Sequence, residues 1–178
     1  PADTCNDNER QEVATYIDNN IRLLSMLLDD IINIGDIEKG EYHLKIKTCP
    51  VNRQARMAMA AVKYRVPAAI DMQFRSALPD HYKVRTDSKR IQQVLINFLT
   101  NAIKHTSAGS ITVSVARDTA ADGTATIQYI VSDTGTGIPP EEAEKIFERF
   151  VKLNDFVQGT GLGLNICHNI ATKLGGSV

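Results

Sequence analysis

The chain has 178 residues, a hydrophobic share of 43% and a formal net charge of −1. This length accommodates one domain of ordinary size with an appendage, and this composition is typical of a soluble globular protein. A nearly neutral chain is not expected to bind nucleic acid through bulk electrostatics. The three cysteines (Cys5, Cys49, Cys167) are far apart and odd in number, which favours reduced thiols over a disulfide framework or a zinc site.

No apolar run approaches the ~18 residues that a membrane span requires, and no signal peptide is visible. The chain starts at Pro1 without Met, so we expect a fragment of a longer protein. We therefore expect a cytoplasmic piece with no membrane segment of its own, cut from a larger protein that is either soluble or membrane-bound.

Residues 8–38 are predicted to form one long helix. Five aliphatic residues follow one another at 4-3-4-3 spacing, and Leu27 and Ile34 widen the stripe: Ile17, Ile21, Leu24, Leu28 and Ile31. An average spacing of 3.5 residues matches the seam of a helical bundle. We expect a homodimer through residues 8–38, with packing of the helix on its own domain as the alternative.

The remaining chain alternates between strand and helix patterns. Strands are predicted at Tyr42–Thr48, Ile70–Phe74, Lys83–Arg85, Ile111–Val115 and Thr126–Val131, the last two as a hairpin. Helices are predicted at Asn52–Tyr64, from an Asp87 N-cap to about His105, and over 141–149 and 162–174. The predicted fold class is α+β: a two-layer sandwich of a mixed β-sheet with helices on one face, preceded by a long bundle-forming helix.

Two glycine clusters dominate the C-terminal third. They are Asp133-Thr-Gly135-Thr-Gly137-Ile138 and Gly159-Thr-Gly161-Leu-Gly163-Leu164. Glycine weakens regular structure, so such clusters indicate positive φ or close backbone approach. A nucleotide phosphate chain makes that demand, and the second cluster runs directly into a predicted helix, whose N-terminus attracts anions. The pattern predicts a nucleotide pocket.

A second polar group lies on the 87–105 helix. Asn97 and Asn101 are one helical turn apart, and Lys104 follows on the same face. An amide oxygen is a hard ligand suited to Mg²⁺, and a lysine ammonium suits the phosphates that share that ion. One capping and one solvated asparagine is the simpler interpretation of the same triplet.

Together these motifs resemble the N, G1, F and G2 boxes of sensor histidine kinases, members of the Bergerat-fold (gyrase, Hsp90, histidine kinase, MutL) ATP-binding superfamily. The boxes stand as Asn97-Phe-Leu-Thr-Asn101-Ala-Ile-Lys104-His105, Asp133-Thr-Gly-Thr-Gly-Ile138, Phe147-Glu-Arg-Phe150 and Gly159-Thr-Gly-Leu-Gly-Leu164. Upstream, residues 24–40 resemble the second helix of the family's dimerisation and phosphotransfer domain. The resemblance divides the chain into the end of that helical domain (1–40) and a catalytic ATP-binding domain (41–178).

The resemblance implies ATP and Mg²⁺ as ligands and a role for each box. Asp133 would accept a hydrogen bond from the adenine amino group, with Gly135 and Gly137 under the base, Ile138 packed on it and His105 beside it. Asn101 would bind Mg²⁺. Phosphate contacts would come from Asn97, Lys104, Lys152 and the second loop, and Phe150 would anchor a lid over 151–161. The second loop contributes Gly159, Thr160, Gly161, Leu162 and Gly163.

The resemblance also implies transfer of the γ-phosphoryl group to a histidine and relay to a response regulator receiver domain. Hydrolase members of the superfamily carry a Glu where this chain has Asn97, a neutral amide that cannot activate water. No H-E-x-x-T-P-like acceptor string is present, so we expect no autophosphorylation in cis. The chain also stops at Val178, where the family continues with closing strands.

Two other functions fit parts of the sequence. A module of the same fold could sense ATP, or act as a scaffold, without transferring phosphate. The Asp133-Thr134-Gly135 string occurs in aspartic proteases, but that chemistry needs two carboxylates sharing a proton. A Rossmann site is weaker still, because no strong strand precedes Gly159.

Overall fold

The computed structural model describes residues 43–119, 123–151 and 160–178, with isolated residues 11, 13–14, 17, 21, 24, 28, 31–32 and 35. Most of the helix predicted over 8–38 thus lies outside the described residues. Those that are described there are helical. Their large apolar side chains are more than half exposed.

A three-stranded mixed sheet forms one layer of the domain. Its order is β2 (Ile70–Ser76), β4 (Gly109–Thr119) and β5 (Ala125–Asp133). β2 runs parallel to β4 and β5 antiparallel to it, with Ile111 opposite Asp133 at the end of β5. A separate antiparallel pair joins β1 (Lys47–Pro50) to β3 (Lys83–Thr86).

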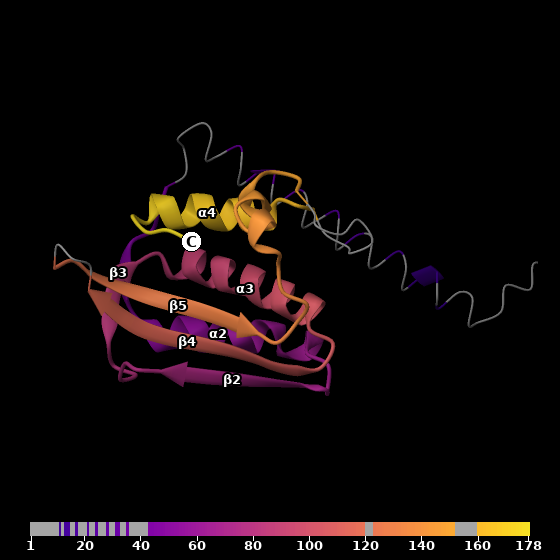
Figure 1. Cartoon of the computed structure of the whole chain (residues 1–178). Helices are drawn as coiled ribbons and strands as arrows, with labels where there is room; N and C mark the ends of the chain where they lie inside the picture. Colours follow the sequence, from indigo (N-terminus) through magenta and orange to yellow (C-terminus); the bar gives the residue numbers. More distant parts are fainter. Residues whose placement is uncertain are drawn as a thin grey trace, which may run out of the picture.

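Helices form the second layer. Figure 1 shows α2 (Val51–Val62) and α3 (Ser88–His105) on one face of the sheet, with α4 (Gly163–Lys173) stacked over α3. The main core lies between the sheet and α2 and α3, and a smaller cluster joins α4 to α3. Alternate residues of β4 (Ile111, Val113, Val115) are buried, while the residues between them are half-exposed. Among the described residues, helices therefore cover one face of the sheet, which confirms the predicted α+β class.

Asp87 caps α3, as its position before the apolar pattern predicted. Its Oδ1 accepts hydrogen bonds from the Lys89 N–H (3.0 Å) and the Arg90 N–H (3.3 Å). Its Oδ2 accepts one from the Lys45 N–H (2.7 Å). One carboxylate thus starts the helix and fastens the chain leading into β1.

Two predicted elements differ from the structure. The strand predicted over 42–48 is displaced to Lys47–Pro50, since the Lys45 N–H is taken by Asp87 rather than by a neighbouring strand. The helix predicted over 141–149 is wrong: two 3₁₀ turns stand there, η2 (Pro140–Glu142) and η3 (Lys145–Phe147). The Phe147 carbonyl, which would continue a helix, accepts instead from the Asn165 side chain (2.9 Å).

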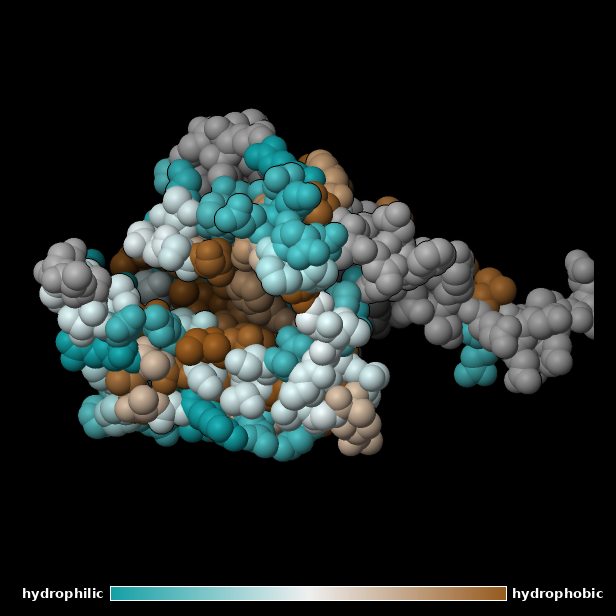
Figure 2. All heavy atoms as spheres, viewed as in Figure 1, coloured by the Kyte–Doolittle hydropathy of each residue, from teal (hydrophilic) through white to brown (hydrophobic). Residues whose placement is uncertain are grey.

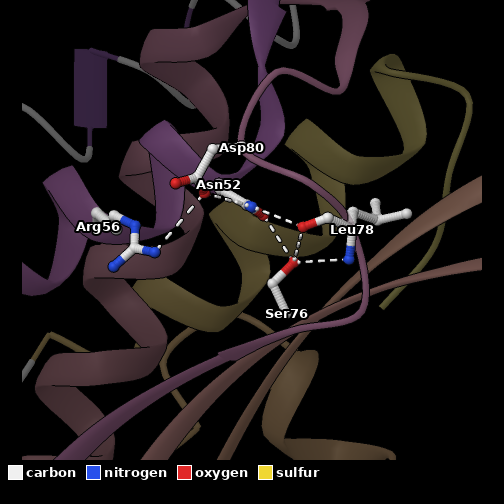
Figure 3. A network of polar contacts seen from close by, with 5 residues as sticks. All are labelled: Asn52, Arg56, Ser76, Leu78 and Asp80. Carbon is white, nitrogen blue, oxygen red and sulfur yellow. Dashed lines mark hydrogen bonds and ion pairs between the residues drawn. The ribbon is translucent and has the colours of Figure 1, made fainter.

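A polar network fastens α2 to the connection between β2 and β3 (Figure 3). The Asn52 amide donates to the Leu78 carbonyl (2.9 Å) and to Asp80 (2.8 Å), while its oxygen accepts from the Ser76 hydroxyl (2.8 Å). Arg56 lies 3.6 Å from Asp80. Asn52 is buried, so this satisfied network fixes α2 on the sheet.

No helix in the part of the chain that the structure describes is long and apolar enough to cross a membrane.

Candidate functional site

The ends of three elements lie close to one another at one side of the domain. In Figure 1 the carboxyl end of β5, the C-terminal end of α3 and the amino end of α4 lie on the same side of the molecule. Figure 2 shows that this view of the molecule is hollowed between α4 and the sheet, and that the side chains at the bottom of the hollow are apolar. The first glycine cluster follows β5, the described part of the second leads into α4, and the two asparagines lie in the middle of α3.

The first glycine loop packs directly on the end of α3. Asp133 Oδ1 accepts hydrogen bonds from the Gly135 N–H (2.8 Å) and the Thr106 hydroxyl (3.4 Å). The Thr136 N–H donates to the His105 carbonyl (3.3 Å). A Cβ on Gly135 would lie 2.4 Å from that carbonyl oxygen, so a side chain there would push the loop away from α3. The Asp133 carboxylate is held at the surface, where a ligand can reach it.

The two asparagines are in contact at the middle of α3. The Asn101 amide donates to Asn97 Oδ1 at 3.5 Å, and both side chains are half-buried. Asn97 faces the start of α4, because a Cβ on Gly163 would lie 2.4 Å from its Nδ2 and 2.7 Å from its Oδ1. Lys104 and His105 are exposed on the last turn of α3. The structure therefore brings Asn97 into contact with both Asn101 and Gly163, and Lys104 lies one turn beyond Asn101 on α3.

The ends of the segment over 151–160 are joined by a backbone clamp. The Phe150 N–H donates to the Gly161 carbonyl (2.9 Å), and a Cβ on Gly161 would lie 2.8 Å from the Phe150 backbone. Both residues have left-handed backbones, with φ +64° at Phe150 and +71° at Gly161. The Phe150 ring is exposed. Lys152 and Gly159 lie outside the described residues.

The start of α4 presents backbone amides. No side chain of the described residues caps this helix, whose N-cap is Leu162, and the first bond of the helix joins the Ile166 N–H to the Leu162 carbonyl (2.9 Å). The preceding amides of the first turn have no acceptor within the helix, an arrangement that attracts anions. The Leu162 side chain is fully buried beside Ile166 and Ile170, so only its backbone can face a ligand. Its N–H donates to Thr160 Oγ1 (3.1 Å).

Metal binding here would depend on Asn101 and on oxygens of the ligand. Within the described ranges, no group of three His, Cys, Asp or Glu residues could hold a metal ion. An amide oxygen with phosphate and water oxygens is the kind of coordination that Mg²⁺ accepts. The half-buried Asn101, linked through Asn97 to the start of α4, fits that requirement.

An open hollow of about 390 Å³ lies elsewhere, over the start of α2. The hydrogen bond from Asn52, followed by the charge of Arg56, lowers the pKa of the Asp80 carboxyl at its border. Asn52, Arg56 and Asp80 of this hollow bond one another in the network of Figure 3. This hollow contains none of the residues at the ends of β5, α3 and α4, and no function is assigned to it.

Two residues of this region were missed by sequence reasoning: Thr106, which donates to Asp133, and Thr134, which is bonded to Ser110. Thr106 follows the last residue of α3, and that position was the only sequence feature that pointed to it. Thr134 lies inside the first glycine cluster, where nothing in the motif distinguishes it from a spacer.

A family model described as "Histidine kinase-, DNA gyrase B-, and HSP90-like ATPase" matches residues 86–178. The chain belongs to this ATPase family. Within it, the chain carries a histidine kinase catalytic ATP-binding domain. The mixed sheet under helices is not the all-β setting that the aspartic-protease alternative requires.

Relatives and solved structures agree with this family. The chain is 32% identical over 160 residues to sensor protein EvgS of Escherichia coli O157:H7, covering 85% of the chain and 13% of EvgS. It is 34% identical over 175 residues to sensor protein IrlS of Burkholderia pseudomallei, covering 96% of the chain and 36% of IrlS. Full-length ShkA, crystallised with AMPPNP, superposes with a TM-score of 0.77 at 26% identity over 94% of this chain and 34% of ShkA. The chain thus spans about a third or less of these relatives.

Proposed function

We propose that this chain is the ATP- and Mg²⁺-binding catalytic part of a two-component sensor histidine kinase. It would transfer the γ-phosphoryl group of ATP to a histidine on a separate helix, for relay to an aspartate of a response regulator receiver domain. The observation that supports the proposal best is the contact of Asn97 with Gly163 at the start of α4, with Asn101 hydrogen-bonded to Asn97. This arrangement supports a metal-binding Asn101 that is linked through Asn97 to backbone amides suited to phosphate.

The residues then divide along the nucleotide. Asp133 would accept from the adenine amino group, with Gly135, Gly137, Ile138 and His105 around the base. Asn101 would bind Mg²⁺. Asn97, Lys104, Lys152 and the backbone of residues 159–163 would contact the phosphates, and Phe150 would anchor the lid over 151–161.

Transfer is favoured over hydrolysis by the residue at position 97. Phosphoryl transfer needs positioning and charge neutralisation more than covalent chemistry. Asn97 is a neutral amide whose oxygen already accepts from Asn101, so it cannot take a proton from water. ATP bound here would persist until an acceptor histidine arrives.

The parent protein would supply that acceptor. Residues 1–40 would be the end of a helical dimerisation domain and residues 41–178 the catalytic domain. Exposed aliphatic side chains along the described helical positions, among them Ile17, Ile21, Leu24 and Leu28, support a homodimer through residues 8–38. Such a unit would act in the cytoplasm.

Calorimetry on the full chain tests the nucleotide site. Asn101→Ala should abolish the Mg²⁺-dependent part of ATP binding, because the amide ligand is lost. Gln92→Ala, which removes a carboxamide bonded to Ser88 at the other end of α3, should leave ATP binding unchanged. Equal ATP affinities of Asn101→Ala and wild type would refute the ligand role.

Labelled ATP and a separate protein bearing an acceptor-histidine helix test the reaction. The proposal expects label on that histidine and little free phosphate. ATP binding without transfer would favour an ATP-sensing or scaffold module. Rapid multiple-turnover hydrolysis would contradict the argument from Asn97.

A further inference from the structure

The turn after β5 is fastened to the start of β4 by one threonine. The Thr134 N–H donates to the Ser110 carbonyl (3.1 Å), and the Ser110 N–H donates to Thr134 Oγ1 (3.0 Å). In a regular antiparallel rung, a backbone carbonyl would accept that second bond. The hydroxyl replaces the carbonyl, so the chain can leave the sheet immediately after Asp133 while the last rung stays complete.

Gly109 shapes the space in which this hydroxyl lies. A Cβ on Gly109 would be 2.2 Å from Thr134 Oγ1, far closer than two such atoms can approach. Its backbone has φ +119°, a conformation that residues with a side chain rarely adopt. Its N–H is held by the Ala69 carbonyl (3.0 Å). Gly109 and Thr134 therefore pack closely against one another, and the glycine motifs of the sequence do not predict this approach.

The fitted pair anchors the loop that follows Asp133 and bonds its carboxylate. Thr134 ties the loop directly after Asp133 to β4, and two residues further on the Thr136 N–H ties it to the His105 carbonyl. Between these ties, Asp133 Oδ1 accepts from the Gly135 N–H (2.8 Å). Without the hydroxyl, the Ser110 N–H loses its acceptor, and the first tie keeps only the Thr134 N–H bond.

We propose that Thr134 is a positioning residue for base recognition: its hydroxyl, seated against Gly109, holds the Asp133 carboxylate in the place that selects adenine. The inference rests on the proposed nucleotide function and adds the residue that sets its specificity. Thr134 acts through Asp133 and does not touch the base.

Calorimetric titration of the full chain with ATP and with GTP tests this role. Thr134→Val keeps the shape and removes the hydroxyl, which bonds the Ser110 N–H (3.0 Å) and the Ser110 carbonyl (3.5 Å), so the ATP-over-GTP preference should fall by about five- to tenfold. Thr134→Ser keeps the oxygen and should stay within about twofold of wild type. Gly109→Ala should lose the preference as Thr134→Val does, because its Cβ displaces the hydroxyl. Thr112→Val is the matched control. Thr112 lies on β4 opposite Ser132, and its substitution should leave the ATP-over-GTP preference unchanged.

Coupling to Asp133 separates positioning from general support of the fold. In an Asp133→Asn background, Thr134→Val should leave the remaining preference unchanged, since the two residues act as one unit. Exchange of the Ser110 amide hydrogen should be faster in Thr134→Val than in wild type. An unchanged ATP-over-GTP ratio in Thr134→Val, or an equal loss of both affinities, would overturn the inference. Wild type that binds neither nucleotide would instead refute the proposed function itself.

Discussion

At the scale of single residues, the candidate site depends on close approaches that leave no room for a side chain. Gly163 is the sharpest case, because its missing Cβ is where the Asn97 carboxamide lies. Asn97 in turn holds Asn101. An atom added at Gly163 would therefore act on the proposed metal ligand through one intermediate.

Gly163→Ala should weaken ATP binding by about tenfold, as expected when an overpacked contact displaces a ligand-holding side chain. Gly176→Ala is the control, since a Cβ there would meet only the Ala171 carbonyl oxygen, at an ordinary 3.7 Å. Titration with ATP and Mg²⁺ measures both. Equal affinities in the two variants would show that Asn97 does not need its present position.

Tyr129 gives the domain a stability that depends on pH. Burial, followed by the charge of Cys49, raises the pKa of the Tyr129 hydroxyl well above its usual range. The hydroxyl also donates to Gln54 Oε1 (2.6 Å). The unfolded chain therefore loses this proton at a lower pH than the folded one. The contribution to the free energy of unfolding is complete below about pH 10, the ordinary tyrosine value, and is lost as pH rises above it.

Tyr129→Phe should lower the free energy of unfolding by about 1 kcal/mol at pH 7, because the bond to Gln54 is lost. Between pH 9 and pH 11, the variant should lose less stability than wild type does. Urea unfolding at several pH values measures both effects, and Tyr64→Phe, at an exposed tyrosine, is the control. A variant whose alkaline decline equals that of wild type would contradict the assignment.

Residue contacts could be predicted from the sequence only where they follow from spacing. Asn97 and Asn101 are one helical turn apart, so their contact was predictable. Thr106 contacts Asp133, and Thr134 contacts Ser110, in each case across the fold. No local sequence pattern encodes these two contacts. The roles of the boxes came from the family resemblance, because spacing alone left the two asparagines ambiguous.

At the scale of elements, helices with clear end signals were predicted well. Asp87 marked the start of α3, and Gly163–Lys173 nearly matches the predicted 162–174. The 141–149 segment has a charge-rich, helix-like composition, yet Pro139, Pro140 and the left-handed Phe150 confine it to two short turns. Composition cannot foresee that Asn165 takes the Phe147 carbonyl.

Asp87→Ala should destabilise the domain by about 2 kcal/mol, since it removes a helix cap together with the bond to the Lys45 N–H. Asp87→Ser keeps a capping oxygen and should cost less. Urea unfolding monitored by circular dichroism compares the three proteins. A loss below about 0.5 kcal/mol in Asp87→Ala would mean that water replaces the cap.

At the scale of the whole molecule, the sequence predicted the α+β class and the mixed sheet. It could not predict that β1 and β3 form a sheet of their own, because pairing between distant strands has no local signal. The dimer predicted through residues 8–38 stays a prediction. It rests on a stripe whose described members, such as Ile21 and Leu28, are 56% and 62% exposed in the single chain.

Sedimentation equilibrium tests that stripe. Wild type should sediment as a dimer, and Ile21→Glu with Leu28→Glu should sediment as a monomer, because charges cannot be buried in an apolar seam. Ser25→Glu, between the apolar positions of the predicted stripe, is the control and should remain dimeric. A wild type that stays monomeric at high concentration would contradict a dimer through this stripe.

The division of the apolar interior into two clusters has a consequence for how a nucleotide leaves. α4 rests on α3 through Leu162, Ile166 and Ile170, whereas the loop after β5 is joined to the main sheet. Lifting α4 uncovers only that small cluster, and such partial opening needs less free energy than unfolding the domain. In the proposed site, the base would lie against the part that stays folded and the phosphates against the part that opens. The nucleotide could then leave without unfolding of the domain.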